Sequence, residues 1–387
     1  MDMPMKIGIV GNYGNNNNGD EAILLGILVQ LETYYKVKRS DITVFSNQPE
    51  QTKTRYGVEA NPLYYKKGNK YQTLLTTMSK NYPVVRKLDL LIIGGGGILM
   101  DLYGTEAFLF GMYGWLGKLG RTPVAIYGVG AGPILTKQGS IVLKSLAHLA
   151  KLVTVRDGES ERLLQSIGVT SPIHVIGDPA FYVPKPENVQ KNERPLQIGV
   201  TAVPYYHGSY WPEEKLELYE DYIEGMARNL DELLDKHPDA QINFFATKYP
   251  QDLEVTKDIK QRMKAQDRCY VHDQELLPED IVAFTAKQDV VIGTRLHSLI
   301  LSLVSGTPVM AIGYHHKVKD FMDMIGYGEN AIAIEELNKQ TVFFEERFAK
   351  MEQNWSKELH AFQATGEDLR ERAIMGMRLI DTTIVKK

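Results

Sequence analysis

Residues 6–31 read KIGIVGNYGNNNNGDEAILLGILVQL, and this stretch carries the pattern that decides the fold. Lys6–Val10 is a short apolar run typical of a buried strand, and Asp20–Leu31 is typical of a helix. The loop between them consists mostly of Gly and Asn, which tolerate positive φ and let backbone N–H groups approach a ligand. Strand, loop and helix in this order predict the first unit of a doubly wound sheet, where ligands bind at such loops.

The same alternation of apolar runs and amphipathic stretches continues along the chain. Residues 182–195 hold three prolines and many charges, which is typical of a linker, and the pattern restarts after them. A long helix is predicted over residues 212–236. The other predicted strands are residues 42–45, 90–93, 124–127, 152–155 and 174–176 before the linker and residues 197–200, 242–245, 290–292 and 309–312 after it.

The strands and helices before and after the linker predict an α/β fold with two Rossmann-like domains that face each other across a cleft, as in glycosyltransferase-B enzymes. A length of 387 residues suits two domains better than one core. We expect an N-terminal domain over residues 1–183 and a C-terminal domain over residues 184–367. By analogy with that architecture, a last helix over residues 368–387 is expected to return to the first domain.

Composition excludes several classes of protein. The chain is 43% hydrophobic and 24% charged, which is ordinary for a globular protein, and its net charge of −4 argues against a nucleic-acid partner. Its single cysteine, Cys269, can form neither an intramolecular disulfide nor a zinc-type pair, so we expect a reducing, cytoplasmic location. The N-terminal residues lack a signal-peptide pattern, and Asp89 and four glycines interrupt the longest apolar run.

Three glycine-rich loops follow predicted strands in the first half. The first ends in Asp20 and Glu21, which either cap the helix and pair with its dipole or meet a sugar hydroxyl or move a proton. The second contains Gly94–Gly97, which serves either close strand–helix packing or close approach of a ligand. With Gly128–Pro133 as the third, the loops together predict a ligand crevice. The dinucleotide and P-loop fingerprints are absent, which disfavours a dehydrogenase.

Cationic residues also follow predicted strands. Arg156 either pairs with a neighbouring carboxylate or faces the cleft, and Asp178 either sits in a plain turn or faces the cleft. Thr294–His297 begins a helix, where free N–H groups and the guanidinium of Arg295 favour an anion and His297 can exchange a proton. The alternative is a histidine that caps the helix and an arginine at the surface. The adjacent His315 and His316 are poor metal ligands without carboxylate or cysteine partners, so we predict no metal site.

Together these segments resemble the polysaccharide pyruvyltransferase family, above all its bacterial members that modify the wall polysaccharide holding S-layer proteins. The resemblance runs from about residue 6 to residue 326. It departs from the family pattern at His315-His316, where Asp-Pro is expected. The segments that carry it are 19–24, 94–97, 128–133, 155–157, 177–180, 295–297 and 314–318.

The resemblance implies phosphoenolpyruvate as donor and a 4,6-pyruvate ketal on a hexosamine as product, with N-acetylmannosamine in a lipid-diphosphate-linked disaccharide as acceptor. It implies no cofactor. The N-terminal domain is expected on the acceptor side and the C-terminal domain on the donor side. We predict His297, Arg295, Asp20 and Glu21 as catalytic residues and Arg156, Arg295, Lys317, Thr294 and His316 as donor-binding residues. The predicted acceptor-binding residues are Tyr13, Gly14, Asn16, Asn18, Gly95, Gly96 and Asp178.

Two basic segments suggest peripheral contact with the cytoplasmic face of a membrane. Residues 60–88 contain six Lys or Arg, interleaved tyrosines and no acid. The C-terminal helix sets Arg370, Arg372 and Arg378 beside apolar residues. A flexible solvated face is the alternative for the first segment. A nucleotide-sugar glycosyltransferase and a non-catalytic sugar-binding protein are the alternatives for the whole chain.

Overall fold

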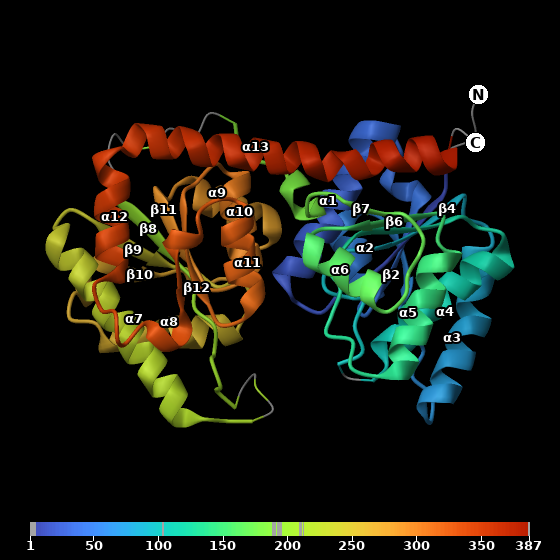
Figure 1. Cartoon of the computed structure of the whole chain (residues 1–387), viewed down its shortest axis with the longest axis horizontal. Coiled ribbons are helices and arrows are strands. Elements are labelled where there is room, and N and C mark those ends of the chain that lie inside the picture. The colour runs from blue at the N-terminus through green and yellow to red at the C-terminus, as the bar shows by residue number, and fades with distance from the viewer. Residues whose placement is uncertain are drawn as a thin grey trace. The chain divides into compact units, whose positions relative to one another are not determined.

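The computed structural model describes residues 5–102, 104–187, 191, 196–208, 211 and 213–385. The chain forms two compact units (Figure 1). Unit 1 comprises Met1–Tyr182 and Leu369–Lys387, and unit 2 comprises Val183–Asp368. The chain therefore leaves unit 1 once and returns to it within its last helix.

Unit 1 is built on a seven-stranded sheet in the order β3-β2-β1-β4-β5-β6-β7. Every strand pair is parallel, so the loops that follow the strands lie at one edge. The strands are β1 Ile7–Val10, β2 Ile42–Ser46, β3 Glu59–Pro62, β4 Leu90–Gly94, β5 Val124–Val129, β6 Leu152–Val155 and β7 Ile173–Val175.

Helices cover both faces of this sheet (Figure 1). The helices before α13 are α1 Asn18–Tyr35, α2 Pro49–Tyr56, α3 Lys70–Val85, α4 Glu106–Gly120, α5 Lys137–Leu149 and α6 Gly158–Ser166. Buried side chains of α3, α4, α5 and α6 form one core cluster with the sheet. On the other face, α1 and the end of α13 (Trp355–Ile380) meet at Tyr127, whose hydroxyl donates to Gln30 at 2.7 Å and to the carbonyl of Ala373 at 3.3 Å.

Unit 2 repeats the architecture with a six-stranded sheet in the order β10-β9-β8-β11-β12-β13, also parallel throughout. The strands are β8 Gln197–Val200, β9 Gln241–Phe244, β10 Cys269–Val271, β11 Val290–Gly293, β12 Val309–Gly313 and β13 Ala331–Ala333. The helices are α7 Leu216–Lys236, α8 Gln251–Arg262, α9 Pro278–Ala286, α10 Leu296–Val304, α11 His316–Met324 and α12 Phe343–Gln353, followed by α13.

The predicted α/β class and the two parallel sheets are confirmed, and each predicted strand lies within two residues of an observed one. The sequence pattern does not predict β3, β10 and β13, which are edge strands of three or four residues. The last helix was predicted to start at residue 368, and α13 starts at Trp355. The predicted start of α7 and part of the predicted linker lie outside the described residues. None of the described helices is apolar over a length that would cross a bilayer.

Candidate functional site

In unit 2, polar residues follow each of five neighbouring strands at the carboxyl edge of the sheet. After β8 and β11, Thr201 and Thr294 are fully buried, and the backbone N–H of Thr294 donates to the Thr201 hydroxyl at 3.0 Å. This bond fixes the turn that leads into α10. The same edge carries Asp252 after β9, Lys317 after β12 and Glu335 after β13. Ligands of open α/β sheets bind at this edge.

Arg295 precedes α10 and forms an ion pair with Asp252 at the start of α8. Its Nε and Nη2 atoms donate to both carboxylate oxygens over 2.7–3.1 Å. Asp252 is fully buried and the Arg295 side chain is 13% exposed. The guanidinium of Arg295 was predicted to bind a substrate anion, and this role stays a prediction. In the structure its Nε and Nη2 atoms hold Asp252, so the ion pair connects the start of α10 to the start of α8.

His297 and Lys317 occupy equivalent places on two neighbouring helices. Each is the second residue of its helix, α10 for His297 and α11 for Lys317. Because β11 and β12 pair in parallel, both helices begin at the same edge of the sheet. Helix N-termini carry partial positive charge, which acts on an anion even where first-turn N–H groups already have acceptors. The arrangement therefore favours an anion beside a histidine and a lysine.

His315 caps α11, and its Nδ1 accepts the backbone N–H of Lys317 at 3.4 Å. Burial, His316 and Lys317 lower the pKa of His315 to about 4. The ring is therefore neutral at pH 7, as an acceptor must be. His315 stabilises the turn before Lys317 rather than supplying a charge.

Because the unfolded chain protonates a histidine near pH 6.5 and His315 in the folded protein only near pH 4, stability should fall as pH decreases between these values. His315→Gln should therefore flatten this part of the profile. Urea denaturation of both proteins at several pH values measures the slope. An unchanged slope in the variant would contradict the assignment.

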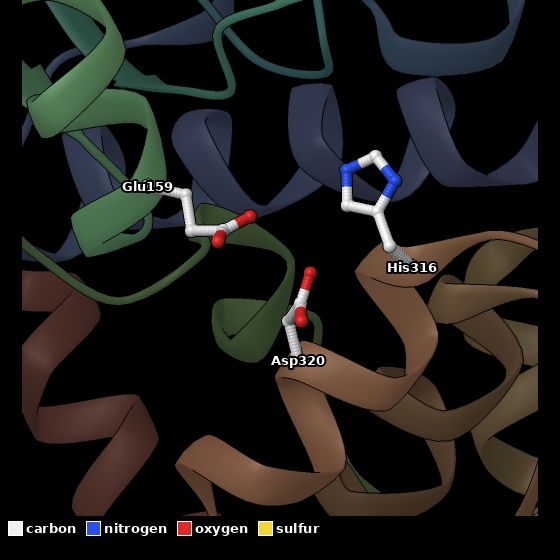
Figure 2. Close-up of side chains that lie close together, drawn as sticks. All are labelled: Glu159, His316 and Asp320. Carbon is white, nitrogen blue, oxygen red and sulfur yellow. The ribbon is translucent and has the colours of Figure 1, made fainter.

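A cavity of about 340 Å³ lies at the carboxyl ends of β12 and β13. Its volume falls within the range of about 300–1,000 Å³ that small-molecule sites occupy. Glu335 in its wall accepts the hydroxyl of Tyr205 at 2.7 Å, which orients the carboxylate. The polar residues of the wall are Tyr314, His315, His316, Lys319 and Glu335. Figure 2 shows the side chain of His316 one helical turn from Asp320 on α11.

In unit 1, Arg156 follows β6 and pairs with Asp178, which follows β7. Nη1 of Arg156 lies 2.9 Å from Oδ2 of Asp178, and the two side chains are only 8% and 5% exposed. Asp178 also accepts the backbone N–H of Ala180 at 3.0 Å. A pair between Arg156 and a carboxylate was one of the two arrangements that the sequence predicted, and it is the one observed. The ion pair connects two strand ends.

Glu21 is held inside unit 1 by two hydrogen bonds and one ion pair. It accepts the backbone N–H of Gly14 at 2.8 Å and the hydroxyl of Tyr56 at 2.5 Å, and Arg55 lies 3.6 Å away. The side chain is 2% exposed. We therefore correct its expected role as a proton-transfer group: Glu21 fixes the first loop to α2.

Tyr13 is also structural. Its hydroxyl donates to the carbonyl of Gly94 at 2.6 Å and the residue is fully buried. Burial first, then the carboxylates of Asp20, Glu21 and Asp178, raise the pKa of its hydroxyl, which stays protonated. This residue therefore does not present its hydroxyl to an acceptor, contrary to the sequence-based expectation.

Asp20 faces the second glycine loop. One carboxylate oxygen accepts the side-chain amides of Asn12 and Asn17 at 3.1 and 3.0 Å. A Cβ on Gly96 would lie 2.5 Å from the other oxygen, and Gly96 has φ +67°, so only glycine fits there. The remaining predicted acceptor residues follow β1 and β4 at the same edge: Gly14, Asn16, Asn18 and Gly95.

Comparison with known proteins identifies the family. The sequence profile of polysaccharide pyruvyl transferases matches residues 17–316. The amylovoran biosynthesis protein AmsJ of Erwinia amylovora is 22% identical over 378 residues, which cover 86% of this chain and 89% of AmsJ.

Solved structures of two other proteins share the fold. The MnaA–UDP complex of S. aureus has a TM-score of 0.61 and 14% identity, with 99% of this chain and 98% of that chain covered. Anabaena HepE in complex with UDP and glucose has a TM-score of 0.62 and 14% identity, with 99% and 100% covered. These likenesses confirm the glycosyltransferase-B-like fold, and the profile match over most of its length shows that the chain belongs to the polysaccharide pyruvyl transferase family.

Proposed function

We propose that this chain transfers the enolpyruvyl group of phosphoenolpyruvate to a hexosamine and closes a 4,6-ketal with release of phosphate. The acceptor is N-acetylmannosamine in a lipid-diphosphate-linked disaccharide at the cytoplasmic face of the membrane, a precursor of the wall polysaccharide that anchors S-layer proteins. Membership in the family supports pyruvyl transfer in polysaccharide biosynthesis. The donor, the acceptor and the S-layer role are our extension of it.

The paired N-termini of α10 and α11 carry the proposal. Phosphoenolpyruvate bears a carboxylate and a phosphate, and two helix N-termini with Lys317 and His297 attract such a ligand. The cavity beside His316 gives it room. Since Asp252 balances the charge of Arg295, we assign the main attraction to Lys317 and the helix ends.

The proposed reaction begins when His297 gives a proton to the methylene carbon of the donor. The resulting cation at C2 accepts one sugar hydroxyl, the phosphate leaves, and the second hydroxyl closes the ketal. The two hydroxyl protons go to a base and to the departing phosphate. Water must be excluded, because it would trap the cation.

Incubation of the protein with phosphoenolpyruvate and a water-soluble aryl-linked amino-sugar disaccharide tests this reaction. We expect the acceptor to gain one pyruvate ketal by mass spectrometry, with one phosphate released for each ketal formed. Phosphate release without ketal formation, or sugar transfer from a nucleotide sugar in its place, would refute the proposal.

Lys317→Gln should raise KM for phosphoenolpyruvate about 10- to 150-fold, because it removes a charge-assisted hydrogen bond worth about 1.5–3 kcal/mol. Steady-state kinetics with varied donor measure the effect. Lys287→Gln is the matched control, since this exposed lysine follows α9 at the opposite edge of the same sheet. An equal KM for both variants would remove Lys317 from the donor site.

A further inference from the structure

The outer faces of α3, α4 and α5 expose large apolar side chains. Tyr71 and Leu75, one helical turn apart on α3, are each 68% exposed. The others are Trp115 and Leu119 on α4, Leu135 just before α5, and Ile141 on α5. We call these six residues the apolar face.

The three helices form a continuous surface of unit 1. α4 contacts both α3 and α5, and the three helices lie side by side in Figure 1. Their inward side chains, such as Val85, Tyr113 and Leu146, belong to the core under the helices. The six residues of the apolar face are exposed and are not members of that core. An exposed apolar surface of this kind marks an interaction site.

The charge of the same surface is positive although the chain as a whole has a net charge of −4. The sequences of α3, α4 and α5 contain five lysines and one acid, Glu106. Two residues separate the exposed Lys66 and Lys67 from the start of α3, and residues 60–88 contain no Asp or Glu. Exposed apolar groups among lysines match an anionic lipid surface, which offers both acyl chains and negative headgroups.

We propose that the apolar face, with Lys66, Lys67 and Lys70 beside it, binds the surface of an anionic lipid bilayer. The proposal rests on the proposed function in one respect: a lipid-linked acceptor requires the enzyme at a membrane. A second copy of the chain is a poorer occupant, because two like faces would bring their lysines together.

The C-terminal helix α13, the second basic segment of the sequence, differs from the apolar face because its apolar residues are buried. Ile374, Met377 and Ile380 of α13 are buried, at 6%, 0% and 0% exposure, and therefore cannot enter a membrane. Arg370 donates to the carbonyl of Phe181 and lies over the ring of Tyr182. The prediction that the C-terminal helix meets lipid with its apolar residues is thus wrong, because these residues pack inside unit 1.

Vesicle flotation of the full chain tests the proposal. The wild-type protein should float with vesicles of phosphatidylglycerol and phosphatidylcholine, less at high salt, and not with phosphatidylcholine alone. Replacing Lys66, Lys67 and Lys70 together by Gln should weaken binding about 100-fold. Tyr71→Gln/Leu75→Gln should weaken binding about 10-fold and make the remainder fully salt-sensitive.

Matched controls lie in unit 2. Leu216→Gln/Leu218→Gln replaces two exposed leucines of α7, and Lys236→Gln/Lys257→Gln replaces two exposed lysines; both should bind vesicles like the wild type. All variants should form ketal on the water-soluble acceptor at the wild-type rate. This assay tests the proposed reaction without lipid, and flotation tests lipid binding without the reaction, so the two proposals can fail independently.

Flotation of the two test variants at the wild-type level would overturn the proposal. So would a wild-type protein that does not float but forms a dimer that Tyr71→Gln/Leu75→Gln dissociates, since that result assigns the face to a second copy.

Discussion

His297→Ala should lower kcat for ketal formation by about 10²- to 10⁴-fold, the usual contribution of a positioned general acid, and change KM for phosphoenolpyruvate much less. The reason is positional. His297 lies in the first turn of α10, next to the proposed anion site, while Lys317 and the helix N-termini hold the donor. Steady-state kinetics at saturating acceptor separate the two parameters.

His360→Ala is the matched control, because His360 is an exposed histidine of α13 in the same unit. A variant at position 297 that loses donor affinity with unchanged kcat would make His297 a binding residue.

Asp252→Ala should lower the free energy of unfolding by about 3–5 kcal/mol, which is the usual cost of leaving one member of a buried ion pair without its partner. Asp252 is fully buried and both of its carboxylate oxygens accept from Arg295. In the variant, the guanidinium of Arg295 would lose its partner at a position that water does not reach. Chemical denaturation monitored by circular dichroism measures the change.

Two comparisons sharpen this second test. Glu254→Ala breaks an exposed pair with Lys257 on the same helix, 3.1 Å apart, and should cost less than about 1 kcal/mol. The double variant Asp252→Ala/Arg295→Leu should recover part of the loss, because it leaves no unpaired buried charge. If Asp252→Ala and Glu254→Ala cost the same, the pair does not position α10.

The sequence predicted the interior of both sheets well because buried parallel strands are continuous apolar runs with sharp ends. The edge strands were not predicted. A strand at the edge of a sheet is less buried, so it does not need a continuous apolar run, and β3 has the sequence EANP. The start of α13 was missed for a similar reason. Its first half is mostly polar, and few positions, such as the fully buried Phe362, mark the inward face.

The candidate site shows where single-sequence reasoning ends. Strand-end positions predicted which polar residues gather at the edge of each sheet. They did not reveal partners, because Arg295 and Asp252 are 43 residues apart and Glu21 and Tyr56 are 35 apart. Such pairs form only when the chain brings separate strand ends together. One feature of the sequence could have indicated Asp252 as a site residue: it lies in the first turn of a helix that follows a strand.

Because α13 returns to unit 1, this unit is completed only late in translation. Residues 183–368 are translated before the segment 369–385, yet this late segment supplies buried groups such as Met377 to the part of the protein made first. During translation, Tyr127 and the residues around it in unit 1 therefore stay uncovered until residues 369–385 leave the ribosome. Shortening the chain after residue 368 would thus harm the portion synthesised earliest and spare the portion next to the cut.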